Sequence, residues 1–265
     1  PAPPSGSTDS YLDTSVTLTA FSTVPSGTYN ITHVRIYRAT AGVYLYVDEI
    51  PVSQVIYEDT VSADALGNEL PSLTWDMPPS GLKGLINLPN GLMAGFTGRD
   101  VYFCEPYHPY AWPTKYNQTV DYPIVGFGRT DTTLVVLTSG APYFIQGTHP
   151  ENMAVVKSEL EQACVAKQSI VSVNGMVLYA SPDGLVQISP GNTKLITESM
   201  FRRDQWQAMF KPESIRAYQH DLKYVAFYDN GTTQGGFIYD LSTGQFAMHT
   251  IYALRSEEHT SELQS

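Results

Sequence analysis

Residues 81–254 repeat one pattern of short apolar strands, and this repeat constrains the fold more than any other feature. Four segments each contain an apolar strand, a turn, a stronger apolar strand, a Gly turn and a third strand. A unit of such a repeat buries its apolar face only against a neighbour, so the units must stack. Equivalent positions of the strongest strand are Val101, Leu134, Val177 and Tyr224, at steps of 33, 43 and 47 residues.

A four-stranded blade of a β-propeller recurs at about 40–45 residues. The spacing therefore predicts an incomplete β-propeller over residues 81–254, with about four visible blades and the last one partial. The turns between strands agree, because their residues admit the positive φ that tight hairpins need. These turns are Thr138-Ser139-Gly140, Asn174-Gly175, Pro182-Asp183-Gly184 and Asn230-Gly231.

Two segments depart from the simple plan. Residues 151–167 fit either a helix or a strand, and we expect an outer strand at Met153–Leu160 because the preceding blade needs a fourth strand. Residues Glu198–Met209 predict a short helix inserted between blades and closed by Pro212.

A separate β module precedes the repeat. In residues 32–38, the apolar Val34 and Ile36 alternate with polar neighbours, as in a half-buried strand. The stretch HVRIYRATAGVYLYVDEIP, followed by VIYEDT, resembles the second half of a fibronectin type III-like module. That resemblance implies an N-terminally truncated β-sandwich over residues 11–61.

The segments that flank this module have the composition of linkers. Residues 1–10 are rich in Pro, Gly and Ser and offer nothing to bury. Residues 62–80 form a polar, Pro-rich connector, and we place the domain boundary near Pro78. The whole chain is therefore predicted to be all-β, with a sandwich followed by an incomplete propeller.

Composition excludes several classes of protein. The formal net charge is −11, which argues against binding of nucleic acid phosphates. The longest apolar runs, such as Leu134–Leu137, are far too short to span a bilayer, so we expect no membrane partner. With only Cys104 and Cys164 present, a disulfide scaffold is excluded and two free thiols are expected.

The C-terminal residues 255–265, RSEEHTSELQS, read residue for residue as the translation of a widely used sequencing-library adapter. Such scars are set aside before any fold is inferred. We therefore expect a non-native tail on an environmental gene fragment that is open at both ends. The tail carries a net charge of −2, which leaves −9 for residues 1–254.

The run Glu105–Pro113, EPYHPYAWP, is the most unusual segment of the repeat region. Its prolines restrict the backbone, while large flat side chains are available for contact. One interpretation is a stacking platform for a sugar or a partner protein, carried by Tyr107, His108, Tyr110 and Trp112. The other, which we favour, is a rigid loop between strands that caps the apolar edge of the propeller.

The same run contributes to a family resemblance. Together with DYPIVG, LVVLTSGAPYFIQGTHPENM, LEQACV and LYASPDGLVQI, it resembles a β-propeller region of tailed-bacteriophage virion proteins. The nearest relatives would be tail-tube or nozzle proteins, or DNA-stabilisation proteins of the head–tail junction. The resemblance covers about residues 81–252 and implies a structural subunit with no catalytic residues to carry over.

No pattern points to an enzyme. The chain has no Walker loop, no GxGxxG, no GxSxG and no Cys/His spacing typical of zinc, so we expect no cofactor and no metal. Glycoside hydrolysis needs two carboxyl groups at a defined separation, and the sequence places no such pair on one rim. The acidic residues available are Glu105, Asp121, Glu159, Glu161, Asp183 and Asp229.

The function expected from these observations is a non-enzymatic structural subunit of a phage tail or head–tail connector, located in the virion and assembled in the host cytoplasm. Its partners would be other virion tail proteins and copies of itself in a cyclic ring. DNA would pass through a channel without specific binding. The alternatives are a carbohydrate-binding or glycan-degrading propeller of a receptor-binding tail component, and a bacterial adhesin with fibronectin-like modules.

Overall fold

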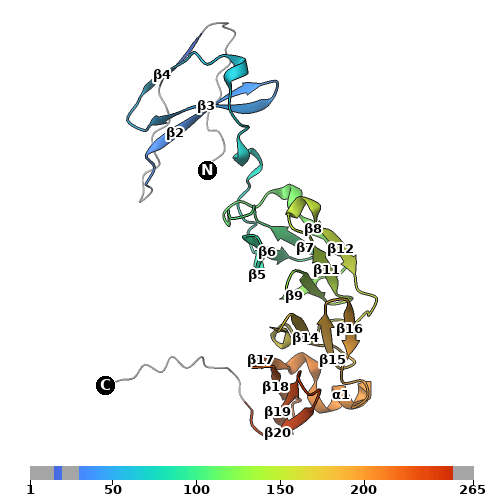
Figure 1. The fold of residues 1–265 in the computed structure, drawn as a ribbon. Helices are drawn as coiled ribbons and strands as arrows, with labels where there is room; N and C mark the ends of the chain where they lie inside the picture. The colour runs from blue at the N-terminus through green and yellow to red at the C-terminus, as the bar shows by residue number, and fades with distance from the viewer. Residues whose placement is uncertain (1–14, 20–29, 253–265) are drawn as a thin grey trace, which may run out of the picture. The chain divides into compact units, whose positions relative to one another are not determined.

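The computed structural model describes residues 15–19 and 30–252, and the linker and adapter-like tail predicted at the two ends lie largely or wholly outside them. The chain divides into two compact units, Pro1–Trp75 and Asp76–Ser265. In the described part, short antiparallel strands account for nearly all regular structure, with one α-helix (Figure 1). The chain is therefore all-β at this level, as the sequence predicts.

The described residues of the first unit contain two strand pairs. β1 (Val16–Thr19) pairs with β4 (Ile56–Asp59), and β2 (His33–Thr40) pairs with β3 (Val43–Pro51). Buried side chains of β2 and β3 form a small apolar core with partly buried residues of both pairs; its buried members are Ile36, Val47 and Ile50.

One ion pair joins the two strand pairs of this unit. Arg38 donates from Nε and Nη2 to the two carboxylate oxygens of Asp59, at 3.0 and 2.7 Å. Such bidentate geometry is the strong form of this contact. Asp59 is buried, so the pairing compensates its loss of water.

The segment after β4 is partly ordered against β3. Residues 67–70 run beside it through backbone hydrogen bonds to Tyr44 and Tyr46 and a bridge between Leu45 and Glu69. Two 3-10 turns, η1 (Ala63–Ala65) and η2 (Pro71–Thr74), lie in the same segment. The boundary between the units falls after Trp75, a few residues before Pro78.

The second unit consists of four antiparallel sheets, each a simple meander of four consecutive strands. Sheet 1 holds β5 (Lys83–Leu88), β6 (Leu92–Thr97), β7 (Asp100–Phe103) and β8 (Gln118–Thr119). Sheet 2 holds β9 (Ile124–Arg129), β10 (Leu134–Thr138), β11 (Tyr143–Gln146) and β12 (Ala154–Lys157). Sheet 3 holds β13 (Val171–Val173), β14 (Met176–Ala180), β15 (Leu185–Ser189) and β16 (Asn192–Leu195), and sheet 4 holds β17 (Arg216–His220), β18 (Lys223–Asp229), β19 (Gln234–Asp240) and β20 (Phe246–His249).

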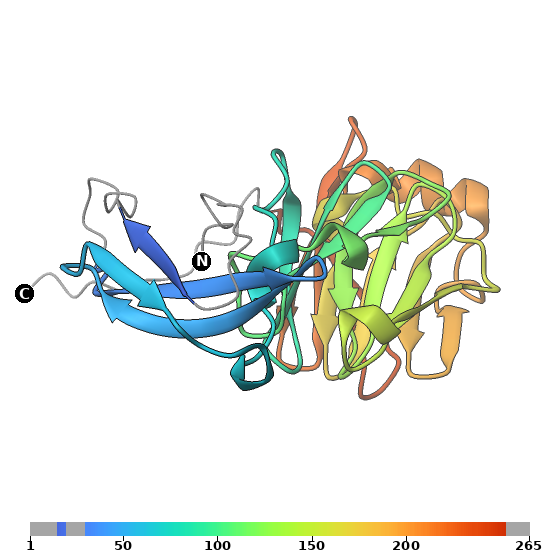
Figure 2. The same ribbon diagram turned by 90° about the horizontal axis from the view of Figure 1, so that it is seen from above.

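The sheets follow one another in chain order (Figure 1) and overlap when seen from above (Figure 2). The first strands of successive sheets contact each other: β5 with β9, β9 with β13, and β13 with β17. Three apolar clusters fill the spaces between sheets. One joins sheets 1 and 2, one joins sheets 2 and 3, and one joins sheets 3 and 4. In Figure 1, sheets 1 and 4 lie at opposite ends of this series.

The structure corrects the alignment of the first repeat. Val101 lies in β7, the third strand of sheet 1, whereas Leu134, Val177 and Tyr224 lie in second strands. The true second strands begin at residues 92, 134, 176 and 223, which gives steps of 42, 42 and 47. The missed strand is β5, whose alternation is interrupted by a register shift between Lys83 and Ile86 that includes Gly84 at φ +62°.

The two irregular segments are settled by the structure. The strand expected within Met153–Leu160 is confirmed as β12, which pairs with β11. The helix is also confirmed, but α1 (Arg203–Phe210) begins five residues later than predicted. Gln205 accepts a hydrogen bond from the Arg202 backbone N–H at 3.0 Å, which satisfies one orphan donor at the helix start. Of the predicted turn residues, Gly140 does not adopt positive φ, whereas Asn174 and Gly175 do.

The helix closes one end of the cluster between sheets 3 and 4. Trp206 and Phe210 are fully buried there, 4.6 Å apart between ring centroids, and both rings contact Phe237 of β19. The Trp206 indole donates to the Ser181 carbonyl at 3.1 Å, so its polar atom is satisfied as well.

We predict that Trp206→Ala lowers the free energy of unfolding by about 3–5 kcal/mol, because it opens a large cavity and leaves the Ser181 carbonyl unpaired. Urea unfolding followed by far-UV circular dichroism measures this without relying on Trp fluorescence. Met209→Ala on the same helix is the control, since Met209 is 41% exposed, and we expect a change within about 0.5 kcal/mol. Equal effects of the two substitutions would contradict the prediction.

Candidate functional site

The residues Glu105–Pro113, called the aromatic loop below, connect β7 of sheet 1 to the 3-10 turn η3 (Thr114–Tyr116). The loop is closed by its own backbone. Glu105 N–H donates to the Ala111 carbonyl at 2.8 Å, while His108 N–H donates to the Glu105 carbonyl and Ala111 N–H to the His108 carbonyl, both at 2.9 Å. These bonds leave little freedom for the side chains that the loop presents.

The four aromatic-loop residues singled out from the sequence divide into two kinds. Tyr107 and Tyr110 are 74% and 53% exposed, whereas Trp112 is only 4% exposed. Trp112 donates from its indole to the Pro109 carbonyl at 2.9 Å, and its backbone N–H donates to the Asp76 carbonyl at 2.8 Å. Trp112 therefore serves as an internal anchor of the loop and has no face available for stacking on a ligand.

His108 is half-buried and joins the exposed side of the loop to its backbone. Its Nδ1 lies 2.7 Å from the Pro106 carbonyl, and its ring meets the edge of Tyr110 at 5.7 Å between centroids. Because the contact partner is a carbonyl oxygen, Nδ1 carries the proton in this arrangement. The imidazole thus positions the Tyr110 ring.

Tyr107 rests on a glycine of the neighbouring hairpin. Its N–H donates to the Gly91 carbonyl at 2.9 Å, and a Cβ placed on Gly91 would lie 2.4 Å from the Tyr107 ring. Gly91 also has φ +68°, a conformation that favours glycine. Both constraints exclude larger residues at position 91, and together they hold the exposed phenol in one place.

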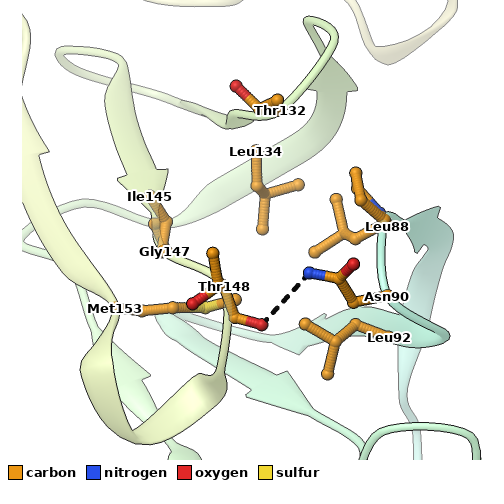
Figure 3. Close-up of a pocket in the computed structure, with 10 residues that line it drawn as sticks. Leu88, Asn90, Leu92, Thr132, Leu134, Ile145, Gly147, Thr148 and Met153 are labelled. Atoms are coloured by element: carbon orange, nitrogen blue, oxygen red, sulfur yellow. Dashed lines mark hydrogen bonds between the residues drawn. The ribbon is translucent and has the colours of Figure 1, made fainter.

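Residues of the same hairpin, among them Leu88, Asn90 and Leu92, line an apolar pocket (Figure 3). Leu88 and Leu92 face Leu134, Ile145 and Met153 across it. Asn90, next to Gly91, spans the opening with a hydrogen bond from Nδ2 to the Thr148 carbonyl at 3.4 Å. The volume is about 80 Å³, whereas small-molecule sites span about 300–1,000 Å³, so the pocket suits a single inserted side chain better than a sugar ring.

Polar contacts hold the base of the loop. The Tyr116 hydroxyl donates to Glu105 Oε2 at 2.8 Å, and burial together with this carboxylate raises the pKa of Tyr116. The phenol therefore stays a neutral donor at every physiological pH. Asp76 accepts from the Thr114 backbone N–H and hydroxyl at 3.1 and 2.7 Å. Glu105 and Asp76 therefore both act as hydrogen-bond acceptors that hold the loop in place.

Three other acidic side chains considered from the sequence are also engaged locally. Asp121 accepts from the Tyr143 hydroxyl at 2.7 Å, and Asp183 accepts from Gln162 at 2.7 Å and pairs with Arg203 at 2.9 Å. Asp229 accepts hydrogen bonds from the Gln234 side chain and the Gly231 backbone N–H, which keep its pKa below the usual range. These contacts do not bring two carboxylates together. Within residues 15–19 and 30–252, His, Cys, Asp and Glu form no group able to hold a metal ion.

The aromatic loop is recognisable from its composition, whereas the residues that support it are not. The Asn90-Gly91 dipeptide is a hairpin signal and could have marked the turn beside the pocket. The contact between Tyr107 and Gly91 had no local signal, because it joins residues of different strands.

Comparisons with known proteins add little. No protein-family model matches the chain, and no curated protein matches it. Among solved structures, a complex containing S. cerevisiae Dbp5, Nup159 and Gle1 has a chain that is 12% identical with a TM-score of 0.41; the match covers 69% of this chain and 46% of that one. The N-terminal domain of Nup159 is 12% identical with a TM-score of 0.41, over 68% of this chain and 47% of that one. A protein from Bacteroides fragilis is 10% identical with a TM-score of 0.39, over 89% of this chain and 75% of that one. The chain thus spans less than half of the first two matched chains, and TM-scores of this size do not establish a shared fold.

No helix among the described residues has the length and apolar character needed to cross a membrane.

We predict that Gly91→Ala destabilises the protein by more than Gly98→Ala. Both glycines have φ near +60° to +70°, but a Cβ on Gly98 meets nothing within 4 Å. Gly98→Ala therefore reports the cost of positive φ alone, about 1 kcal/mol, and the excess at Gly91 reports displacement of Tyr107. Thermal unfolding measures both. In a Tyr107→Ala background the excess should vanish, and its persistence would contradict the contact.

Both thiols are free and buried, and burial raises the pKa of Cys164 from its ordinary value of 9.0 to about 12. The folded protein then keeps this proton in a pH range where the unfolded chain loses it. The free energy of unfolding should therefore fall as pH rises from 9.0 toward about 12.

We predict a weaker fall in Cys164→Ala, measured by urea unfolding on either side of pH 9. Native protein should also resist labelling by a thiol reagent until urea is added. Rapid labelling of the folded protein would contradict the burial of both thiols.

Proposed function

We propose that this chain is a non-enzymatic structural subunit of a tailed-phage virion, placed in the tail or the head–tail connector and acting through protein–protein assembly. Its first unit is proposed to be a fibronectin type III-like half-sandwich and its second an incomplete β-propeller. Four meander sheets with adjoining first strands, at a period of 42, 42 and 47 residues, support the propeller.

The observation that carries the assembly role is the rigid display of two exposed tyrosines. Tyr107 and Tyr110 stand on a loop whose backbone is closed by hydrogen bonds and anchored by buried Trp112. Tyrosines held in this way offer large contact area at little entropic cost, and aromatic residues are enriched at protein interfaces. The small apolar pocket at the hairpin that Tyr107 contacts would receive one side chain of the partner.

The acidic composition supports a further part of the proposal, that DNA passes the subunit without being bound. Residues 1–254 carry a net charge of −9, and phosphate binding requires clustered Lys and Arg. A gel-shift assay at low salt should show no complex with double-stranded DNA. A protein–DNA complex that dissociates as the salt concentration is raised would contradict the passage of DNA without binding, and would leave the assembly role untouched.

We predict that antibodies against this protein label the tail or the head–tail junction of phage particles whose genome encodes it, as seen by negative-stain electron microscopy. A double variant, Tyr107→Ala with Tyr110→Ala, should lose incorporation into particles because the exposed aromatic contact is removed. Leu222→Ala is the control, since Leu222 is exposed in a turn of sheet 4. Particles that carry no label would overturn the proposal.

The second candidate is a carbohydrate-binding tail component, and the same exposed tyrosines favour it because aromatic faces also stack on sugars. A glycan-binding measurement distinguishes this candidate from the assembly role. A glycan array would show binding that is lost in the double tyrosine variant, with no change in particle assembly.

A further inference from the structure

Three turns between neighbouring strands carry the dipeptide Asn-Gly. They are Asn90-Gly91 between β5 and β6, Asn174-Gly175 between β13 and β14, and Asn230-Gly231 between β18 and β19. An asparagine in this context is chemically labile, because a glycine without Cβ lets its backbone nitrogen approach the side-chain amide carbon of the preceding residue. The folded chain holds the three asparagines in different ways.

The reaction open to each dipeptide is deamidation. The glycine nitrogen bonds to Cγ of the asparagine, the side-chain nitrogen leaves as ammonia with the displaced proton, and a cyclic succinimide remains. Water then adds to one of its two carbonyl carbons and opens the ring to aspartate or isoaspartate. No oxidant or reductant takes part. The first step requires that the side-chain amide leave its hydrogen bonds and that the turn change shape.

Asn230 is the most firmly held of the three. Its Oδ1 accepts from the backbone N–H groups of Thr232 and Thr233 at 2.9 and 2.7 Å. Its Nδ2 donates to the carbonyls of Ala208 and Met209 in α1 at 3.4 and 2.9 Å. The side chain is half-buried. Attack at Cγ would break all four hydrogen bonds and release the end of the helix.

Asn90 is held more weakly. Its side chain is exposed, and Nδ2 donates to the Thr148 carbonyl at 3.4 Å, beyond the about 2.7–3.2 Å of an ordinary bond between N–H and oxygen. The turn itself has a second constraint, because the Tyr107 ring packs against Gly91. Asn90 therefore has one weak side-chain contact and a partly restrained backbone.

Asn174 has the freest side chain. It is exposed, and within the described part of the chain its amide makes no hydrogen bond. Asn174 and Gly175 both have positive φ, +48° and +69°, as in a tight hairpin turn. This backbone region is disfavoured for any residue with a Cβ, so opening the turn relieves strain at Asn174.

We propose that Asn174 is a modification site at which the folded protein deamidates first, with Asn90 slower and Asn230 protected. The ranking follows from the number and length of the hydrogen bonds that each side-chain amide must give up. This inference goes beyond the proposed assembly role and does not depend on it.

The modification has a consequence for the contact between sheets 2 and 3. Asn174 and Asp131 line one polar cavity of about 130 Å³, which the β9–β10 and β13–β14 turns share. A Cβ placed on Gly175 would lie 3.1 Å from both carboxylate oxygens of Asp131. Deamidation therefore adds a second negative charge beside an existing one, and the two turns repel each other until salt screens the charges.

Peptide mapping by mass spectrometry tests the ranking. The whole folded protein is incubated at mildly alkaline pH, and conversion of amide to acid is followed in the three Asn-Gly peptides. We expect conversion fastest at residue 174, slower at residue 90 and slowest at residue 230. The same protein unfolded in urea is the control, because the three identical dipeptides should then react at similar rates.

Two outcomes of that experiment would overturn the proposal. One is conversion of Asn90 or Asn230 in the folded protein as fast as conversion of Asn174. The other is a residue 174 that stays intact in the folded protein while it reacts in urea.

The charge consequence has a separate test, with Asn174→Asp as one of the two products. Its urea midpoint should fall below that of the unmodified protein at low salt, and the loss should shrink at high salt. In an Asp131→Asn background the loss should disappear. Asn90→Asp is the matched control: it makes the same change in a turn whose pocket has no acidic residue in its lining. An equal loss with and without Asp131 would overturn the repulsion.

Discussion

The structure depends on the burial of both faces of its inner sheets. In β10, all five residues are buried, and alternate side chains enter two different apolar clusters. A sheet that is apolar on both faces is stable only between two covering layers. Each sheet of the second unit therefore needs its neighbours, and stability passes along the series from one interface to the next, as in other repeat proteins.

This dependence also explains where function can be placed. The space between sheets is filled with side chains, so contacts with partners must come from loops at the rims or from the faces of the terminal sheets. The aromatic loop illustrates the first case. Its backbone is closed by hydrogen bonds and is joined to the β5–β6 hairpin by the bond from Tyr107 N–H to the Gly91 carbonyl, while the side chains of Tyr107 and Tyr110 are exposed.

Several elements could be predicted from local patterns alone. The strand at β12 and the short helix near Trp206 follow from periodicity and from the needs of the neighbouring strands. The sequence pattern places Val101 in a second strand, whereas it lies in β7, because Gly84 interrupts the alternation of β5 and hides the first strand of the sheet. The aromatic loop was found from its composition, yet composition does not distinguish the anchor Trp112 from the exposed Tyr107. Burial separates them, and burial is decided by residues far away in the chain.

The amino-acid sequence by itself determined the local structure: period-two apolar runs make strands, Asn-Gly and Gly turns join them, and their recurrence makes a series of similar sheets. Only the tertiary structure decided which β-strand leads each sheet, which face of each strand enters which cluster, and which aromatic rings remain exposed. The physical reason is that local conformation follows from side chains a few residues apart, whereas burial follows from contacts such as Tyr107 with Gly91 or Trp206 with Phe237, which join different strands and loops.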